Sequence, residues 1–146
     1  MSIDISDYSH CKTKSNSCNE KNRRFEITDA NNEESQSLLK TKVDGCIYND
    51  THDIKRCDYI FEFKDIFSCF VELKGGNIKY AVEQLKSSLQ NIKVTGKKHA
   101  FVVASKNNSP NATTERQKWE KMFRTQYAAT FDIKNVSMSK PINKLK

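Results

Sequence analysis

Residues 69 to 105 carry the pattern that most constrains the fold, because an apolar strand, an amphipathic helix and a second apolar strand follow one another. Residues 69–74 and 99–105 have the composition of buried strands. Residues 77–90 place apolar side chains at helical spacing behind Asn77, a suitable N-cap. A strand, a helix and a strand in succession form a crossover, so this segment predicts two parallel strands covered by a helix.

The remaining elements are weaker and complete one domain. We expect further strands over residues 24–27, 43–48, 56–63 and 130–136, and helices over residues 33–39 and 114–129. Residues 1–24 are polar and lack periodicity, which predicts a mobile N-terminal arm or an irregular cap. The fold class expected for residues 25–146 is therefore α/β, with a mixed central β-sheet flanked by helices.

The cysteines and the apolar runs indicate where such a chain would work. There are five cysteines, an odd number, and the start of the chain lacks the apolar core of a signal peptide. We therefore expect reduced thiols in a cytoplasmic protein. The longest purely apolar run is residues 100–104, whereas a membrane span needs roughly 20 apolar residues, so no membrane segment is expected.

The net charge of +7 is concentrated near the end of the chain. Residues 106–146 contain nine Lys or Arg and three acidic residues, whereas residues 25–105 contain eleven and twelve. A solvated surface is one reading of this excess. A basic flank that meets a polyanion, beside a locally acidic centre, is the other, and it suits a nucleic-acid partner.

Charged residues interrupt the strand over residues 69–74. Strand side chains alternate between faces, so Glu72 and Lys74 share one face and the neighbouring leucine and valine share the other. Charges in a buried strand cost free energy unless they bind something, and a divalent metal with a phosphate suits two acids and a lysine. The second acid is Asp58, at the start of the preceding strand.

The pattern of an acid, any residue and a lysine occurs four times, so context has to distinguish the copies. The copies begin at Asp53, Glu62, Glu72 and Asp132. Asp53 lies in a polar turn, Glu62 at a strand end, and Asp132 has neither an upstream acid nor a suitable helix after it. Only the third copy has an upstream acid, a glycine pair at positions 75 and 76 that would let a phosphate approach, and an amphipathic helix carrying Gln84.

The segments Cys57-Asp58-Tyr59, Phe70-Val71-Glu72-Leu73-Lys74-Gly75 and Ala81-Val82-Glu83-Gln84-Leu85 together resemble the PD-(D/E)xK nuclease superfamily. The resemblance covers roughly residues 33 to 105. It implies a restriction-endonuclease-like core, built from a helix, a strand meander, a helix and another strand. Ser88 stands where one exonuclease-like branch carries a tyrosine, four residues after the glutamine.

The resemblance also implies roles for individual residues. Asp58, Glu72 and the main-chain carbonyl of Leu73 would hold Mg²⁺, for which Mn²⁺ can substitute, and Glu34 from the first helix would add a ligand. Lys74 would orient or deprotonate the attacking water, with Gln84 pointing back to the strand ends. The implied function is a metal-dependent nuclease that hydrolyses phosphodiester bonds, most simply a DNA endonuclease.

Several alternatives stay open at this point. Glu72 and Lys74 could form an ion pair at a sheet edge, and Asp44 could be mistaken for a ligand although a turn role beside Gly45 suits it better. His10, Cys11 and Cys18 could join Cys46 or Cys57 at a zinc ion, although no C-x-x-C spacing is present. The chain could also be a non-catalytic nucleic-acid-binding or assembly module. The sequence does not distinguish DNA from RNA as the partner. It also does not distinguish a homodimer from a subunit of a larger complex.

Overall fold

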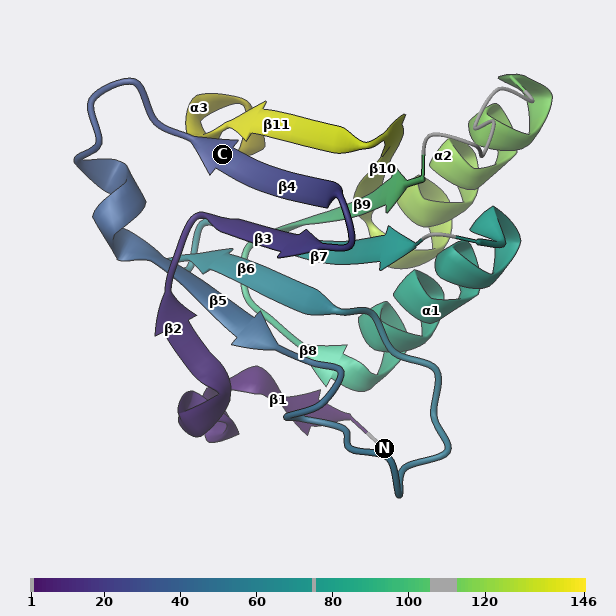
Figure 1. Cartoon of the computed structure of the whole chain (residues 1–146), viewed down its shortest axis with the longest axis horizontal. Coiled ribbons are helices and arrows are strands. Elements are labelled where there is room, and N and C mark those ends of the chain that lie inside the picture. Colours follow the sequence, from purple (N-terminus) through teal and green to yellow (C-terminus); the bar gives the residue numbers. More distant parts are fainter. Residues whose placement is uncertain (1, 75, 106–112) are drawn as a thin grey trace.

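The largest element of the structure, a computed structural model that describes residues 2–74, 76–105 and 113–146, is a six-stranded sheet. The strand order is β10-β9-β7-β6-β5-β2 (Figure 1). These strands are β2 (Lys12–Lys14), β5 (Leu38–Lys42), β6 (Tyr59–Phe63), β7 (Phe67–Lys74), β9 (Lys97–Ala104) and β10 (Ala129–Asn135).

The sheet is mixed, as the sequence predicts. Strands β2, β5, β6 and β7 pair with antiparallel neighbours, whereas β9 is parallel to β7 and β10 is parallel to β9. The helix α1 (Ile78–Asn91) connects β7 to β9. The predicted succession of strand, helix and parallel strand is therefore confirmed, and it puts the start of α1 just after the end of β7.

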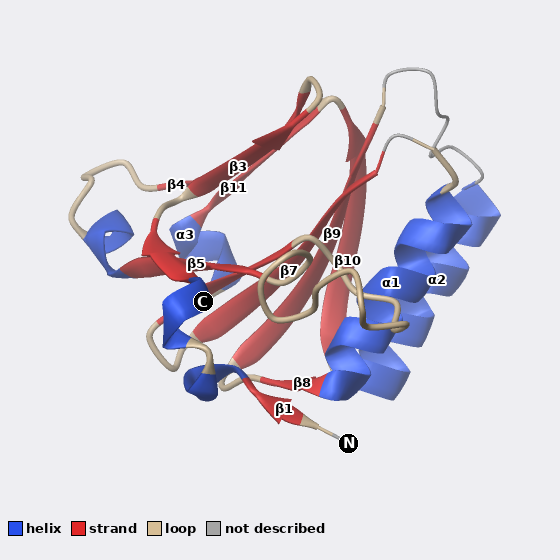
Figure 2. Cartoon of the chain, turned by 60° about the horizontal axis from the view of Figure 1, so that its bottom comes forward, coloured by secondary structure: helices blue, strands red, loops and turns tan. Residues whose placement is uncertain are grey.

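Two helices cover one face of this sheet. Helices α1 and α2 (Thr113–Tyr127) lie side by side there (Figures 1 and 2). Helix α1 begins at its predicted N-cap, where the Asn77 side chain accepts from the Tyr80 backbone N–H at 3.3 Å. Its buried residues Ala81, Val82 and Leu85 lie in one apolar cluster with side chains of the sheet that point to this face: Ile60 of β6, Phe70 of β7 and Val102 of β9.

A second, three-stranded sheet covers the other face (Figure 2). Its order is β11-β4-β3, with β3 (Ser17–Glu20), β4 (Arg23–Thr28) and β11 (Ser137–Pro141). Phe25 of β4 packs between Phe61 and Phe101 of the central sheet, with ring centroids 5.3 Å and 5.5 Å away. The middles of β6, β7 and β9 are thus covered on both faces, which explains why these strands are apolar with almost no alternation.

The N-terminal residues are part of this architecture. Residues 3–20 form β1 (Ile3–Asp4), the 3₁₀ turns η1 (Ile5–Asp7) and η2 (Ser9–Cys11), β2 and β3. Strand β1 pairs with β8 (Ile92–Lys93), and β2 extends the central sheet. The structure therefore replaces the expected irregular arm with ordered strands. These strands are short and polar because they lie at sheet edges, so the sequence pattern does not reveal them.

Two further expectations are corrected between residues 33 and 48. The expected helix over 33–39 is only the 3₁₀ turn η3 (Glu34–Ser37), and Leu38 already begins β5. The expected strand over 43–48 is a series of turns. Residues 38–42 form a strand because they pair with β6, which buries Leu38 and Thr41. The C-terminal helix α3 (Ile142–Leu145) was not expected.

The cysteines are not all reduced. Cys11 of η2 and Cys46 of the turn region are joined by a disulfide across 35 residues, so the expectation of reduced thiols is wrong for this pair. Cys18, Cys57 and Cys69 are buried thiols, which is common because cysteine behaves as a small apolar residue. Burial raises the pKa of the Cys18 thiol to about 12, which makes it a poor nucleophile.

The disulfide should contribute measurably to stability, because a cross-link over 35 residues removes chain entropy from the unfolded state. We expect Cys46→Ser to lower the free energy of unfolding of the oxidised protein by about 2–4 kcal/mol. Urea denaturation followed by circular dichroism measures this. The same comparison in excess dithiol reductant, where neither protein has the bridge, is the control, and the two proteins should then unfold at nearly the same urea concentration. Equal stability of wild type and Cys46→Ser after purification without reductant would contradict the bridge.

His99 in β9 is a buried histidine held as a neutral ring. The Leu145 carbonyl can only accept, so His99 Nε2–H donates to it at 2.7 Å, and Nδ1 accepts from the Thr130 hydroxyl at 2.7 Å. Burial lowers the pKa of His99 below its ordinary value of 6.5, with the hydrogen bond to Leu145 opposing the shift. The ring therefore ties α3 and β10 to β9, and its burial favours the uncharged form.

This arrangement predicts a pH-dependent stability. Near and below pH 6.5, the ordinary pKa of histidine, His99 gains a proton more readily in the unfolded chain than in the folded one. The free energy of unfolding therefore decreases as the pH is lowered. We expect the free energy of unfolding to drop between about pH 7.5 and about pH 5.5, and His99→Gln to lose most of that dependence. Urea titrations at both pH values measure it, with the exposed His52→Gln as control. An unchanged pH dependence in His99→Gln would refute the assignment.

Candidate metal-binding site

Two acidic residues lie together where the ladder between β6 and β7 ends. The last register pair is Tyr59 opposite Val71, so Asp58 directly precedes it on one strand and Glu72 directly follows it on the other. The Asp58 backbone N–H still donates to the Val71 carbonyl at 3.1 Å. The structure therefore brings together the two acids that the sequence predicts as metal ligands, although fourteen residues separate them in the chain.

The carboxylate of Asp58 is fixed across the same strand pair. Its Oδ2 accepts from the backbone N–H of Leu73 at 2.8 Å. A carboxylate oxygen has more than one lone pair, so this bond orients Asp58 and still permits coordination. Leu73 thus lies beside the two acids through its main chain, while its side chain is buried on the opposite face among the residues that contact the small sheet.

Glu72 is almost completely buried. It is 3 % exposed, and the alternation along β7 puts it on the same face as Phe70, which packs against α1. Val71 and Leu73 point to the other face, as predicted. A carboxylate at this depth carries a large desolvation cost, which favours a cation or several donors as its surroundings.

Cys57 lies close to the two acids and to helix α1. Burial raises the pKa of its thiol, and the Glu72 and Asp58 carboxylates raise it further. A thiol in this state is protonated, so Cys57 has a packing role in the site.

Helix α1 fastens the start of β6 through two side chains one turn apart. Gln84 Nε2 donates to the Arg56 carbonyl at 3.1 Å, and Ser88 Oγ accepts from the Cys57 backbone N–H at 2.8 Å. Gln84 Oε1 is buried and makes no hydrogen bond to any described residue. Gln84 was predicted to face the strand ends, and the structure places it there. Ser88 stands where one nuclease branch carries a tyrosine, and the sequence did not predict that its hydroxyl would accept from the Cys57 backbone.

Arg56 was also missed, and it organises the loop before the site. Its guanidinium donates to the Asp44 carboxylate at 3.0 Å and to backbone carbonyls of residues 49, 52 and 54. Asp44 therefore has the turn role expected for it, next to Gly45, whose φ of +96° favours glycine. An arginine among turn-forming residues suggests that its guanidinium binds loop carbonyls, but the sequence does not indicate which carbonyls or which carboxylate it binds.

A polar hollow opens beside this end of the sheet. It has a volume of about 510 Å³ and is lined by Asp44, His52, Asp53, Ile54, Lys55, Arg56, Tyr80 and Gln84. The ammonium of Lys55 lies 5.2 Å from the centre of the exposed Tyr80 ring, which is a cation–π contact. The hollow thus combines Lys55 and Arg56 of the loop with the Tyr80 ring of α1, whereas neither Asp58 nor Glu72 lines it.

The third predicted catalytic residue, Lys74, ends β7, where it pairs with Ala104 of β9. Its side chain and Gly75 lie outside the described residues. At Gly76 an added Cβ would meet no atom within 4 Å, so the chain leaves open space there. The expected close approach of a phosphate to this turn is compatible with that space.

Glu34 does not join the acid pair. It lies in η3, which precedes Leu38, and Leu38 pairs with Phe63 at the far end of β6 from Asp58. Its carboxylate pairs instead with the Lys146 ammonium at 2.7 Å. The expectation that Glu34 is a metal ligand is therefore wrong. The helix that was expected to carry Glu34 toward the acids is only the short turn η3, which leads into the far end of β5.

The other copies of the acid and lysine pattern have ordinary surroundings. Asp53 is exposed in the loop. Asp132 pairs with Arg116 and, at 2.6 Å, with Lys140. Glu62 was expected at an exposed edge, but it lies within the sheet and pairs with Lys12 at 3.1 Å. Water solvates the charge of Asp53, and the lysine and arginine partners neutralise the charges of Asp132 and Glu62, so none of these acids needs a metal ion.

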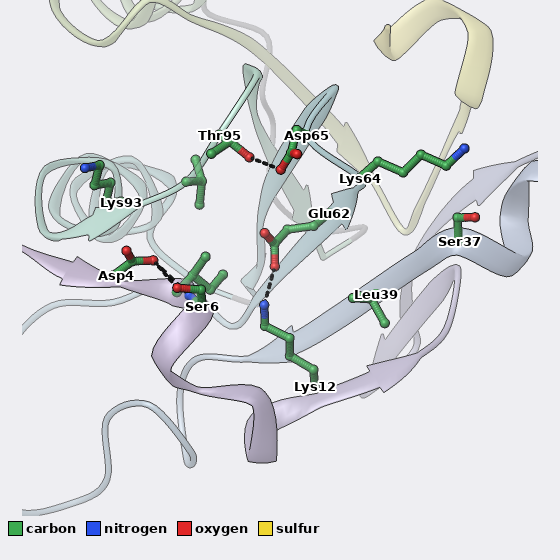
Figure 3. Close-up of a pocket in the computed structure, with 12 residues that line it drawn as sticks. Asp4, Ser6, Lys12, Ser37, Leu39, Glu62, Lys64, Asp65, Lys93 and Thr95 are labelled. Carbon is green, nitrogen blue, oxygen red and sulfur yellow. Dashed lines mark hydrogen bonds and ion pairs between the residues drawn. The ribbon is translucent and has the colours of Figure 1, made fainter.

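Glu62 lines a second hollow at the opposite end of the same strands, also of about 510 Å³. In Figure 3 its carboxylate points to Lys12, Asp65 points to Thr95, and Asp4 points to Ser6. The three acids there are satisfied by neighbouring donors. This hollow therefore lacks the pairing of two acids that distinguishes the Asp58 end.

Comparisons with family models, curated proteins and solved structures give no match to the chain. Among the described helices, none has the length and apolarity to cross a membrane.

The contact between α1 and β6 can be tested through Ser88. Ser88→Ala leaves the buried N–H of Cys57 without its acceptor, so we expect a loss of about 1–3 kcal/mol in the free energy of unfolding. Ser87→Ala, at the adjacent and less buried position, should change stability by less than about 0.5 kcal/mol. Urea denaturation of both variants measures the difference, and equal effects would contradict a specific role for Ser88.

Proposed function

We propose that the protein is a metal-dependent nuclease of the PD-(D/E)xK type that hydrolyses phosphodiester bonds in DNA. The observation that carries this proposal is the position of Asp58 and Glu72 side by side at one end of β6 and β7, with α1 fastened over them. Two carboxylates at a strand end, beside a hollow, are a suitable arrangement for a metal that contacts a phosphate.

The topology supports the proposal. The antiparallel strands β5, β6 and β7 form a meander, α1 follows, and β9 returns parallel to β7. This is the order that the resemblance implies, with one acid at the start of the second strand of the meander and the other near the end of the third. The helix that should precede the meander is reduced to η3, which marks a departure from the implied core.

The donor set fits Mg²⁺. Carboxylate oxygens of Asp58 and Glu72, together with the Leu73 carbonyl, are hard oxygen donors that suit this ion, and Mn²⁺ accepts the same ligands. When bound, the metal would supply a water of lowered pKa and charge neutralisation at the phosphate. The deep burial of Glu72 limits the loss of this attraction to solvent screening.

The chain's own residues would divide the remaining work. Asp58, held by the Leu73 N–H, would keep its carboxylate in one orientation, and Gln84 would hold the start of β6 against α1. Lys74 would bring its ammonium to the water or to the developing negative charge. This last role rests on the sequence pattern.

The nucleic-acid partner is supported by exposed cationic side chains. Lys55 lines the hollow next to Gln84, and helix α2, which packs beside α1, exposes Lys118, Lys121 and Arg124 along its length. Such groups bind phosphates without reading sequence, so binding should weaken steeply as salt increases.

Cleavage of plasmid and linear DNA with Mg²⁺ or Mn²⁺ tests the proposal. We expect cleavage by the wild type, no cleavage with a chelator, and loss of cleavage in Asp58→Asn and Glu72→Gln. Lys74→Met should reduce the rate by about 10²–10⁴-fold. Asp65→Asn is the matched control, since it removes a carboxylate at the opposite end of the same two strands.

Two results would contradict the enzyme. Salt-dependent DNA binding that persists in Asp58→Asn, with no cleavage in either metal, would favour a non-catalytic binding module. Absence of both binding and cleavage would remove the nucleic-acid partner. RNA of matched sequence, included in parallel, decides between DNA and RNA as substrate.

A further inference from the structure

A second group of potential metal ligands lies apart from the acid pair. The ligand atoms of His10, Cys11 and Cys46 all lie within 4.8 Å of one another. His10 and Cys11 come from η2, and Cys46 comes from the turns after β5, so the fold itself brings them together. In the structure the two sulfur atoms are joined as a disulfide.

Reduction would convert this group into a set of two thiols and an imidazole. A dithiol reductant delivers two electrons and two protons, the Cys11–Cys46 bond breaks, and the reductant becomes a disulfide. The two new thiols remain near each other because η2 and the turn are held independently of the bridge. Buried Ile5, Val43 and Tyr48 lie in the same apolar cluster, and the Val43 backbone N–H bonds to the Asp58 carbonyl at 3.0 Å.

Two thiolates and one imidazole are ligands that Zn²⁺ prefers. Zinc–sulfur and zinc–nitrogen bonds of about 2.3 Å and 2.0–2.1 Å put tetrahedral ligands about 3.5–3.8 Å apart. The spread of at most 4.8 Å is therefore close to the required geometry. His10 is exposed, so its ring can rotate toward the sulfurs, and Cys46 is only half-buried, so water can fill the fourth position.

We propose that the reduced protein binds Zn²⁺ through His10, Cys11 and Cys46, and that the disulfide closes this site. The remaining thiols do not contribute. Cys18 and Cys69 are buried in the cluster on the opposite face of the sheet, and Cys57 faces Ser88 and the two acids. The site is distinct in ligands and position from the proposed Mg²⁺ site, so it does not depend on nuclease activity.

The proposal couples metal binding to redox state and to pH. A metal that binds only the dithiol form stabilises that form, so Zn²⁺ should raise the reduction potential of the Cys11–Cys46 pair. Each thiol releases its proton when the metal binds, so affinity should fall as the solution is made more acidic.

Titration of the reduced full-length protein with Co²⁺, followed by competition with Zn²⁺, tests the site. Cobalt bound to thiolates gives charge-transfer and tetrahedral d–d absorption, which carboxylate ligands do not reproduce. We expect this spectrum in reduced wild type and in the Asp58→Asn/Glu72→Gln double variant, and its absence in the oxidised protein. His10→Gln keeps both cysteines and should weaken Zn²⁺ binding by at least about tenfold, or about 1.4 kcal/mol.

Cys46→Ser should abolish the thiolate spectrum, and Cys18→Ser, the control, should retain it. The proposal is overturned if reduced wild type gives no thiolate–cobalt absorption, or if His10→Gln and Cys46→Ser bind as wild type does. It is also overturned if Cys18→Ser or the double variant at the acid pair loses the spectrum, since the ligands would then lie elsewhere.

Discussion

The pairing of β7 with an antiparallel strand on one side and a parallel strand on the other is the constraint on which the structure depends. Both faces of this strand are covered, by α1 on one side and by the small sheet on the other. Glu72 is therefore almost completely buried. The register with β6 then brings Asp58 beside it, and the same register sends Glu34 to the far end of the strands.

The parts of the fold that the sequence predicts are those with strong local periodicity. Helix α1 and the strands β7 and β9 are long and apolar on a consistent pattern, and their boundaries lie within two residues of those expected. The edge strands β1, β2 and β3 and the strand β5 are short or polar, so tertiary pairing decides their structure. The bond between Cys11 and Cys46 could not be predicted either, because connectivity depends on which distant segments meet.

The candidate site was predictable to a similar extent. The spacing of Asp58, Glu72 and Gln84 around a strand, a turn and a helix was sufficient to place these three residues together. Arg56 and Ser88 were not identified, because each acts on main-chain atoms of neighbouring segments and leaves no pattern in the sequence. Their contacts hold the loop and the start of β6, so the geometry of the acid pair depends on side chains outside the recognisable motif.

Diffraction from crystals soaked with Mn²⁺, with anomalous data, tests the central claim most directly. We predict one anomalous peak within coordination distance of carboxylate oxygens of both Asp58 and Glu72. A well-ordered Asp58 and Glu72 with no peak between them, while Mn²⁺ occupies other sites, would contradict the account.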